Sequence, residues 1–207
     1  MDAQELDRET AVMLEALIRK NRSCRRFYQN HRVDVETLRH LVDLARLSAS
    51  AANRQPLKYV LSCDGDVNAE IFLCLQWAGY LKQWAGPEPG EQPSAYIILL
   101  GDRRISADFS CDPGIAAQSI LLGATEKGLA GCIIAAVDRK RLSNRLEIPD
   151  CLEILLVLAI GKPGEQIVIE PVGPDGDIRY WRDDHGVHHV PKRDLDEVVF
   201  ACYGPGD

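Results

Sequence analysis

The chain has 207 residues, 46% hydrophobic and 27% charged, which is typical of a globular domain of ordinary size. Its net charge of −7 argues against a general binder of nucleic acids or anionic membranes, and no apolar run reaches the ~20 residues that span a bilayer. Seven scattered cysteines without a CxxC pair, and an acidic start without a secretory leader, favour a reduced, cytoplasmic protein.

Helical periodicity and short apolar runs organise the first half of the chain. Apolar residues at helical spacing predict a first helix that ends near Asn21: Ala11, Leu14, Leu17 and Ile18. Asp34 is placed to cap a second helix, whose apolar face is formed by Leu38, Leu41, Val42 and Ala45. Leu57–Ser62 follows as a short strand. We then expect a helix at about Asn68–Trp84 and a Pro/Gly-rich loop over Ala85–Ser94.

The clearest local pattern is a long apolar helix in the middle of the chain. It follows a continuous apolar run, Tyr96–Leu100, which is typical of a strand covered on both faces. Asp112 is expected to cap this helix, Pro113 to take its first position, and Lys127-Gly128 to end it. Its residues are apolar nearly all round, which indicates burial in a large core or at a subunit interface.

Two further buried strands and a tail complete the predicted fold. The strands are Cys132–Val137 and Ile154–Ile160, with a short helix between them at Asp138–Leu146. Turn residues at 173–176 precede three short extended stretches in the tail, which are Ile178–Trp181, His185–Val190 and Val198–Cys202. Strands scattered among helices predict an α+β or α/β layer fold built on one sheet, and we expect one domain over residues 1–207.

Two polar clusters stand out from this framework. The first is Arg22-Ser23-Cys24-Arg25-Arg26-Phe27, directly after the first helix, where three arginines lie close together in a net acidic chain. The planar guanidinium of arginine suits phosphate and carbonyl oxygens, and a serine hydroxyl suits a ribityl or ring acceptor. A short basic run is also typical of a solvated helix end, so this motif alone leaves both interpretations open.

The second cluster is Ser48–Pro56, between the second helix and the first strand. Its small residues would let a flat ring approach the backbone, and Asn53 offers a donor and an acceptor to the edge of a pyrimidine-like ring. An ordinary Ser/Ala loop that ends at a proline has the same pattern.

Together, these clusters resemble those of the nitroreductase-like FMN-dependent flavoproteins. The resemblance rests on R-S-C-R-R-F at 22–27, S-A-A-N-R-Q-P at 50–56, D-P-G-I-A-A-Q-S-I-L-L-G-A-T-E-K-G-L at 112–129, A-I-G-K-P-G-E at 159–165 and P-K-R-D-L-D-E-V-V at 191–199. These segments occur in the order typical of the family and extend over nearly the whole chain.

The resemblance implies an α+β three-layer sandwich, with an antiparallel or mixed sheet flanked by helices, in an intertwined homodimer with FMN at two interface sites. One subunit would contribute Arg22 near the phosphate, Ser23, and Arg25 near N1 and the C2 carbonyl. The other subunit would contribute Ser50, Ala51, Asn53 and Gln55. The backbone beside the flavin N5 and O4 would be that of Ile134, Ala135 and Ala136. The phosphate would also meet a basic side chain, for which the candidates are Lys192, Arg193 and, less strongly, Lys162.

Three positions depart from the family pattern. Asn21 stands where many members have arginine, so one phosphate contact is missing or comes from the basic pair in the tail. The stretch 133–137 is wholly apolar where some nitroreductases carry a carboxylate beside N5, so that contact must be backbone or water. Leu57 replaces the tryptophan that often follows Gln-Pro. These departures affect the assignment of nitroreductase activity more than that of flavin binding.

The activity implied by the resemblance is a ping-pong transfer of hydride or electrons through flavin N5. The donor would be NADH, NADPH or a protein such as ferredoxin, and the acceptor a small electron-poor molecule such as a nitroaromatic or a quinone. Arg25 would stabilise negative charge on reduced FMN, and no side-chain nucleophile or general base is expected. The alternatives are a non-catalytic flavin-binding protein for storage or sensing, reductive dehalogenation, and flavin destruction.

Residues 68–94 form the expected lid over the substrate, and residues from about 165 to 207 form a C-terminal extension. In the lid, Trp77, Tyr80 and Trp84 would stack on flat acceptors. Their helical spacing is equally typical of plain core packing.

Two further motifs lead to negative expectations. The run from Asp183 and Asp184 to His185, His188 and His189 has a histidine spacing compatible with zinc. No cysteine or further histidine lies at a usual spacing from it, so no metal is expected. Cys24 lies beside arginines that would favour a reactive thiolate. No resolving cysteine is close in sequence, and we expect Cys24 to pack under the loop.

Overall fold

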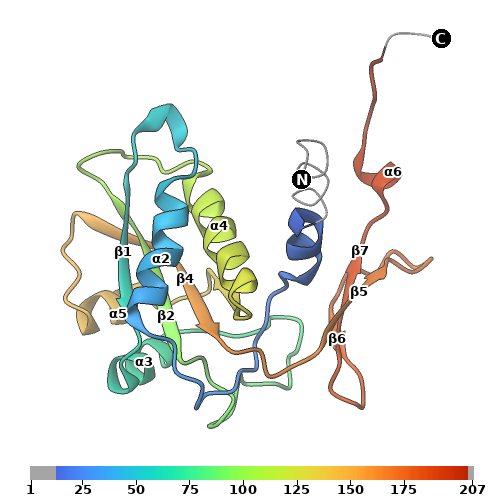
Figure 1. Ribbon diagram of the computed structural model, residues 1–207, viewed down its shortest axis with the longest axis horizontal. Helices are drawn as coiled ribbons and strands as arrows, with labels where there is room; N and C mark the ends of the chain where they lie inside the picture. The colour runs from blue at the N-terminus through green and yellow to red at the C-terminus, as the bar shows by residue number, and fades with distance from the viewer. Residues whose placement is uncertain (1–12, 205–207) are drawn as a thin grey trace, which may run out of the picture.

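The computed structural model describes residues 13–204, and its central element is a four-stranded antiparallel sheet (Figure 1). The strands are β1 (Leu57–Ser62), β2 (Ala95–Asp102), β3 (Ala130–Ile134) and β4 (Leu152–Gly161), in the order β1-β2-β4-β3. All four expected strands are confirmed, β1 with the same ends as predicted. β3 stops before the predicted Val137.

The side chains of the two central strands alternate between two apolar cores. One core contains Tyr96, Ile98, Val157 and Ala159, and the other contains Ile97, Leu99, Leu158 and Ile160. Paired residues such as Ile97 and Leu158 share a core, because partners in an antiparallel pair project to the same face. Both faces of the sheet are therefore covered, as the continuous apolar run in β2 predicted.

Helices cover both faces and make the fold a three-layer sandwich (Figure 1). One layer contains α2 (Val35–Arg46) and α4 (Asp112–Glu126), and the other contains α3 (Gly65–Phe72) and α5 (Arg139–Arg145). A short 3-10 helix, η1 (Ala51–Asn53), precedes β1. The expected α+β architecture, an antiparallel sheet flanked by helices, is confirmed.

Local sequence signals set most of the helix ends. Asp34 caps α2, since its carboxylate accepts a 2.6 Å hydrogen bond from the backbone N–H of Thr37. Gly128 follows α4 in the left-handed conformation, with φ of 71°. The predicted start of α4 is wrong by one residue, because Cys111 is the N-cap and Asp112 already lies in the helix. The carboxylate of Asp112 binds another loop, so it does not cap its own helix.

The helix expected over Asn68–Trp84 is confirmed only as far as Phe72. After α3 ends at Phe72, residues 73–94 form turns and loops. Leu75 forms a β-bridge with Val137, so pairing between distant segments replaces helical hydrogen bonds. Ala78 has φ of 41°, which an α-helix does not accommodate.

The tail forms a second sheet beside the first (Figure 1), where the sequence predicted one sheet. In this tail sheet, β5 (Ile167–Pro171) pairs in parallel with β7 (His188–Lys192), and β6 (Trp181–Arg182) pairs antiparallel with β7. The expected strands at 178–181 and 185–190 are therefore only partly confirmed. α6 (Leu195–Val198) is a single turn, and residues 199–204 form no strand, so the stretch predicted over Val198–Cys202 is not confirmed.

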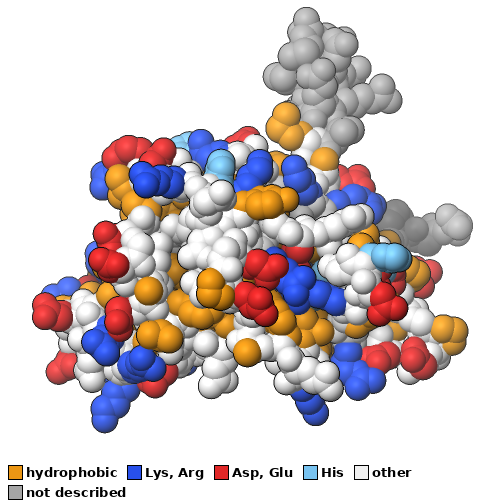
Figure 2. Space-filling model, turned by 90° about the horizontal axis from the view of Figure 1, so that it is seen from below, with side chains coloured by type: hydrophobic (Ala, Val, Ile, Leu, Met, Phe, Trp, Pro, Cys, Tyr) orange, Lys and Arg blue, Asp and Glu red, His pale blue; other side chains and the backbone are white. Residues whose placement is uncertain are grey.

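Residues 13–20 are helical, in agreement with the first predicted helix, of which Ala11 lies outside the described residues. Within residues 13–204, no helix is both long and apolar enough to cross a bilayer. On the face shown in Figure 2, acidic and basic side chains are interspersed among hydrophobic ones.

Candidate functional site

The basic turn, residues 22–27, lies along the edge of the central sheet next to β3. Ser23 forms a parallel β-bridge with Gly131, and the backbone N–H of Cys24 donates to the Gly131 carbonyl at 3.0 Å. A side chain at Gly131 would not fit, because its Cβ would lie 2.5 Å from the carbonyl oxygen of Ala159. Backbone pairing therefore fixes the turn, which is not merely a solvated helix end.

Cys24 is a packing residue of this turn. Its side chain is fully buried, and burial, followed by the charge of Glu165, raises the pKa of Cys24 to about 12. Its Sγ donates to the carbonyl of Arg26 at 3.2 Å. A thiol that stays protonated at neutral pH is a poor nucleophile, so the geometry favours packing over a redox role.

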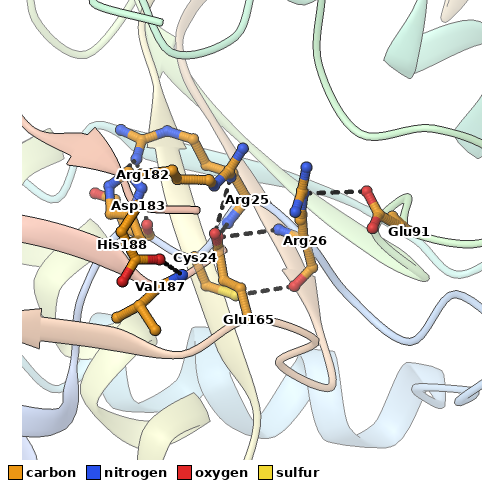
Figure 3. Close-up of polar contacts among 10 residues, drawn as sticks. Cys24, Arg25, Arg26, Glu91, Glu165, Arg182, Asp183, Val187 and His188 are labelled. Carbon is orange, nitrogen blue, oxygen red and sulfur yellow. Dashed lines mark hydrogen bonds and ion pairs between the residues drawn. The ribbon is translucent and has the colours of Figure 1, made fainter. Parts of the chain in front are cut away.

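A buried carboxylate, that of Glu165, holds the basic turn in place (Figure 3). The Glu165 side chain is 1% exposed and accepts hydrogen bonds from the backbone N–H groups of both Arg25 and Arg26, the latter at 3.1 Å. Its other oxygen forms an ion pair with Arg182 of β6 at 2.8 Å. Glu165 therefore ties the backbone of the turn to the tail sheet through charge-assisted hydrogen bonds.

The tail also contacts the side chain of Arg25. Its Nη1 lies 3.4 Å from Nε2 of His188, which is 1% exposed. Its guanidinium lies 4.7 Å from the ring centre of Tyr180, and the ring of Tyr180 lies 5.1 Å from that of Tyr80. The tail and the loop 73–94 therefore meet beside Arg25.

The three expected substrate residues fall into two groups. Trp77 packs against the apolar core, with its ring 5.8 Å from that of Phe72. Tyr80 and Trp84 lie toward the tail, where Arg182 is 4.3 Å from the ring centre of Trp84. A surface depression of about 580 Å³ is lined by Tyr80, Leu81, Lys82, Gln83, Trp84, Arg179 and Arg182. The geometry favours core packing for Trp77 and leaves Tyr80 and Trp84 as substrate candidates.

The second polar cluster forms a strained loop before β1, named here the asparagine loop (residues 50–55). Three of its non-glycine residues have φ between 50° and 52°: Ala52, Asn53 and Gln55. The buried carboxylate of Asp112 accepts hydrogen bonds from the Ser50 hydroxyl at 2.6 Å and from the backbone N–H of Ala51 at 2.8 Å. The Ser50 hydroxyl also accepts from the backbone N–H of Gln55 at 2.9 Å. Ser50 and Asp112 therefore maintain the shape of the loop.

The basic turn and the asparagine loop lie at opposite corners of the central sheet. The loop leads into Leu57, which pairs with Gly101 at one end of β2. Gly131, which lies beside the turn, pairs with Ile160 of β4. Ile160 in turn pairs with Ala95 at the other end of β2. From the usual rise per residue and strand spacing, the corners are roughly 20 Å apart along the strands and roughly 14 Å apart across them. Within one copy of the chain, the two clusters therefore do not meet.

The backbone expected beside the flavin N5 lies at the end of β3 and directly after it. Ile134 is buried, whereas Ala135 and Ala136 are exposed. The carbonyl of Ala136 accepts from the backbone N–H of Gln76 at 3.0 Å, and that of Ala135 accepts from Arg139 at 3.2 Å. Within residues 13–204, the N–H of Ala136 donates to no backbone carbonyl. This segment therefore offers a free backbone donor at the surface.

The basic residues expected at the phosphate lie in two places, the end of the tail sheet and the end of β4. Lys192 is exposed at the end of β7, and Arg193 forms an ion pair with Glu197. Lys162 is exposed after β4, and its carbonyl accepts from the backbone N–H of Tyr28 at 2.9 Å, directly beside the basic turn.

The tail histidines have separate partners. His188 and His189 are consecutive in β7 and so project to opposite faces. His189 lies 2.5 Å from Glu170 and 3.3 Å from Asp183, and these hydrogen bonds raise its pKa. His185 is exposed. In the part of the chain that the structure describes, no group of three or more His, Cys, Asp or Glu side chains is arranged to hold a metal ion.

Four residues that shape the site escaped the sequence reasoning: Asp112 as a loop anchor, Glu165, Tyr180 and His188. Glu165 ends the motif A-I-G-K-P-G-E, but one of its partners is a backbone N–H group 140 residues earlier in the chain. The available signal was an acidic residue after a glycine-rich strand end, which does not identify such a partner.

The chain shares sequence and fold with known proteins. Residues 18–162 match the model of the nitroreductase family, a range that contains the basic turn and the asparagine loop and ends before the tail sheet. A protein of Bacillus subtilis (strain 168), provisionally named NAD(P)H nitroreductase MhqN, is 26% identical over 188 residues, which cover 70% of this chain and 86% of that protein.

Solved structures extend the likeness to the fold. The nitroreductase family protein of Streptococcus pneumoniae TIGR4 superposes with a TM-score of 0.65 at 19% identity, over 91% of this chain and 100% of its own. An FMN-dependent nitroreductase of Clostridium difficile R20291 superposes with a TM-score of 0.57 at 20% identity, over 72% of this chain and 87% of its own. The predicted resemblance is therefore confirmed at the level of sequence pattern and fold.

Proposed function

The chain belongs to the nitroreductase family, and from this membership we propose that it is an FMN-dependent oxidoreductase that uses NADH or NADPH to reduce small electron-poor acceptors. The observation that carries the proposal is the family match over residues 18–162, because this range contains both polar clusters. Nitroaromatics and quinones are the proposed classes of acceptor, since both are flat and electron-poor.

The polar groups of the two clusters fit FMN, whose phosphate and ring carbonyls need donors. The buried Nε of Arg22 has no hydrogen-bond partner within residues 13–204. The backbone N–H of Ala136 is similarly open. Asn53 and Gln55 carry exposed amides, joined by a 3.1 Å hydrogen bond between them. Because the hydroxyl of Ser50 is already engaged within its loop, we assign the FMN contacts to the two amides rather than to Ser50.

We propose further that two copies of the chain complete each site. The two clusters lie at opposite corners of one sheet, so a single FMN contacts both only if they come from different copies. The segment after β7 supports this arrangement, because Phe200 and Tyr203 are 101% and 97% exposed. Large apolar side chains left in water mark an interaction site. Lys192 ends β7 and Arg193 begins this segment, and we propose that one of them reaches a phosphate on the second copy.

When bound, FMN supplies the hydride and electron chemistry between the nicotinamide donor and the acceptor. The residues of the chain bind and orient. Arg25 contributes a permanent positive charge, which favours negative charge on the reduced cofactor. Ala136 contributes a backbone donor in a stretch, 133–137, whose side chains are wholly apolar and move no proton. Tyr80 and Trp84 line the depression in which a flat acceptor can stack.

The visible spectrum of the purified protein tests this function. We expect flavin bands that bleach when NADPH or NADH is added and recover when a nitroaromatic or a quinone follows. Flavin present in stoichiometric amount, with slow reduction and no acceptor turnover, would instead identify a binding or storage protein. A chain that binds no FMN at micromolar concentration would overturn the proposal.

A further inference from the structure

The tail sheet, whose residues lie beyond the range matched by the family model, contacts the arginine assigned to the cofactor. We infer that this sheet is a working part of the FMN site, in which His188 is a positioning residue that accepts a hydrogen bond from Arg25 and fixes its guanidinium against Tyr180. The inference rests on the proposed function, because it takes Arg25 to act on FMN.

Contacts hold both the backbone and the guanidinium of Arg25. At the backbone, Glu165 accepts the N–H of Arg25. At the side chain, Nη1 lies 3.4 Å from Nε2 of His188, and the guanidinium covers the ring of Tyr180 at 4.7 Å. The rings of Tyr180 and His188 are 5.2 Å apart, so the three groups form one cluster. An arginine side chain has many rotamers, and this cluster selects one of them.

The position of His188 is itself fixed. Its backbone N–H donates to the carbonyl of Gln166 at 2.8 Å, directly beside Glu165 in the chain. Glu165 in turn pairs with Arg182 of the neighbouring strand, as Figure 3 shows. The tail sheet and the segment that leads into it therefore anchor both the side chain and the backbone of Arg25.

Burial, helped by neighbouring positive charges, keeps the ring of His188 neutral. Charged groups face it from the basic turn (Arg25), from the segment before β5 (Glu165), from β6 (Arg182) and from its own strand (His189). Burial is the main cause that lowers the pKa of His188 to about 4, with Arg25 and Arg182 adding to the effect and Glu165 opposing it. Because arginine only donates, Nε2 is the acceptor and Nδ1 carries the proton.

Substitutions at His188 test this role through binding of FMN and the flavin midpoint potential. In His188→Leu the acceptor is lost, and we expect FMN to bind about tenfold more weakly, as loss of one charge-assisted hydrogen bond predicts, and a lower midpoint potential. His188→Gln keeps an acceptor oxygen and should stay within about threefold of the parent protein. His185→Leu, which removes an exposed histidine from the same tail, is the matched control and should change neither quantity.

A double-mutant cycle separates positioning from simple structural support. In the Arg25→Ala background, His188→Leu should have no further effect on FMN affinity or potential. An equal effect in both backgrounds, or an unchanged potential in the single variant with full flavin occupancy, would overturn the inference. Should His188→Leu not fold, Tyr180→Leu replaces it, with a shift in the same direction of about threefold. Failure of the parent protein to bind FMN would instead refute the proposed function.

Discussion

The basic turn and the asparagine loop, the two halves of the proposed site, are built in opposite ways. The basic turn is fixed by distant parts of the chain, through its bridge to β3, the buried Glu165 and the tail sheet. The asparagine loop is exposed, has positive φ at three non-glycine residues, and is anchored by one carboxylate, that of Asp112.

This difference gives the two halves of the site different roles in binding. The charged half meets its ligand with side chains already held, so little conformational entropy is lost when a phosphate or ring edge arrives. The amide half keeps Asn53 and Gln55 free of the core, at the cost of a strained backbone. Loss of Glu165, the buried anchor of the first half, should therefore affect folding most, and substitutions in the second half should affect binding most.

Glu165→Ala should have the largest effect. It leaves Arg182, whose side chain is 12% exposed, and two backbone N–H groups without their acceptor. Breaking a buried pair in this way costs about 3–5 kcal/mol of unfolding free energy. Urea unfolding followed by circular dichroism measures it.

The control for Glu165 is Glu91→Ala, which removes the partly exposed partner of Arg26 on the other side of the same turn. An exposed pair contributes about 1 kcal/mol or less. Equal losses in the two variants would show that the turn does not depend on its buried anchor.

Asp112→Ala should have the next largest effect, and it tests the other half of the comparison. The variant removes the acceptor for the Ser50 hydroxyl and the Ala51 N–H, which predicts a loss of about 1–3 kcal/mol together with weaker binding of FMN. Isothermal titration with FMN measures the change in binding, and urea unfolding measures the change in stability. An unaltered dissociation constant would exclude the asparagine loop from the site.

Arg25→Ala should leave folding nearly intact, because the bond to Glu165 is made by the backbone of residue 25. We expect FMN to bind about tenfold more weakly and its midpoint potential to fall, since a positive charge near the reduced cofactor is lost. Potentiometric titration gives the second quantity. An unchanged midpoint potential in a variant fully occupied by FMN would contradict the placement of Arg25 beside the flavin ring.

The smallest expected effect is a pH dependence of stability set by His189. Its hydrogen bonds to Glu170 and Asp183 raise its pKa above the ordinary 6.5, so the folded protein binds this proton more tightly than the unfolded chain. The resulting stability is fully present below pH 6.5 and is lost as the pH rises through the raised pKa. Urea midpoints between pH 6 and 9 should decline in the parent protein and decline less in His189→Gln.

The sequence predicted the layers of the fold better than the supports of the site. α2 with its Asp34 cap, the apolar β2 and the Gly128 helix end carry strong local signals, and all are confirmed. The helix expected through Trp84 is wrong because Leu75 pairs with Val137, a contact that periodicity does not reveal. Glu165 was missed for a similar reason, since backbone N–H groups are its partners and every residue except proline has one.

The opposite-corner placement of the two clusters has a consequence for mixtures of chains. In the proposed dimer, each pocket draws its arginines from one chain and its amides from the other. A heterodimer of Arg25→Ala and Asn53→Ala chains would then have both substitutions in one pocket and none in the other. Two variants that each bind flavin weakly alone should regain flavin affinity and turnover when they are unfolded and refolded together, a form of intragenic complementation.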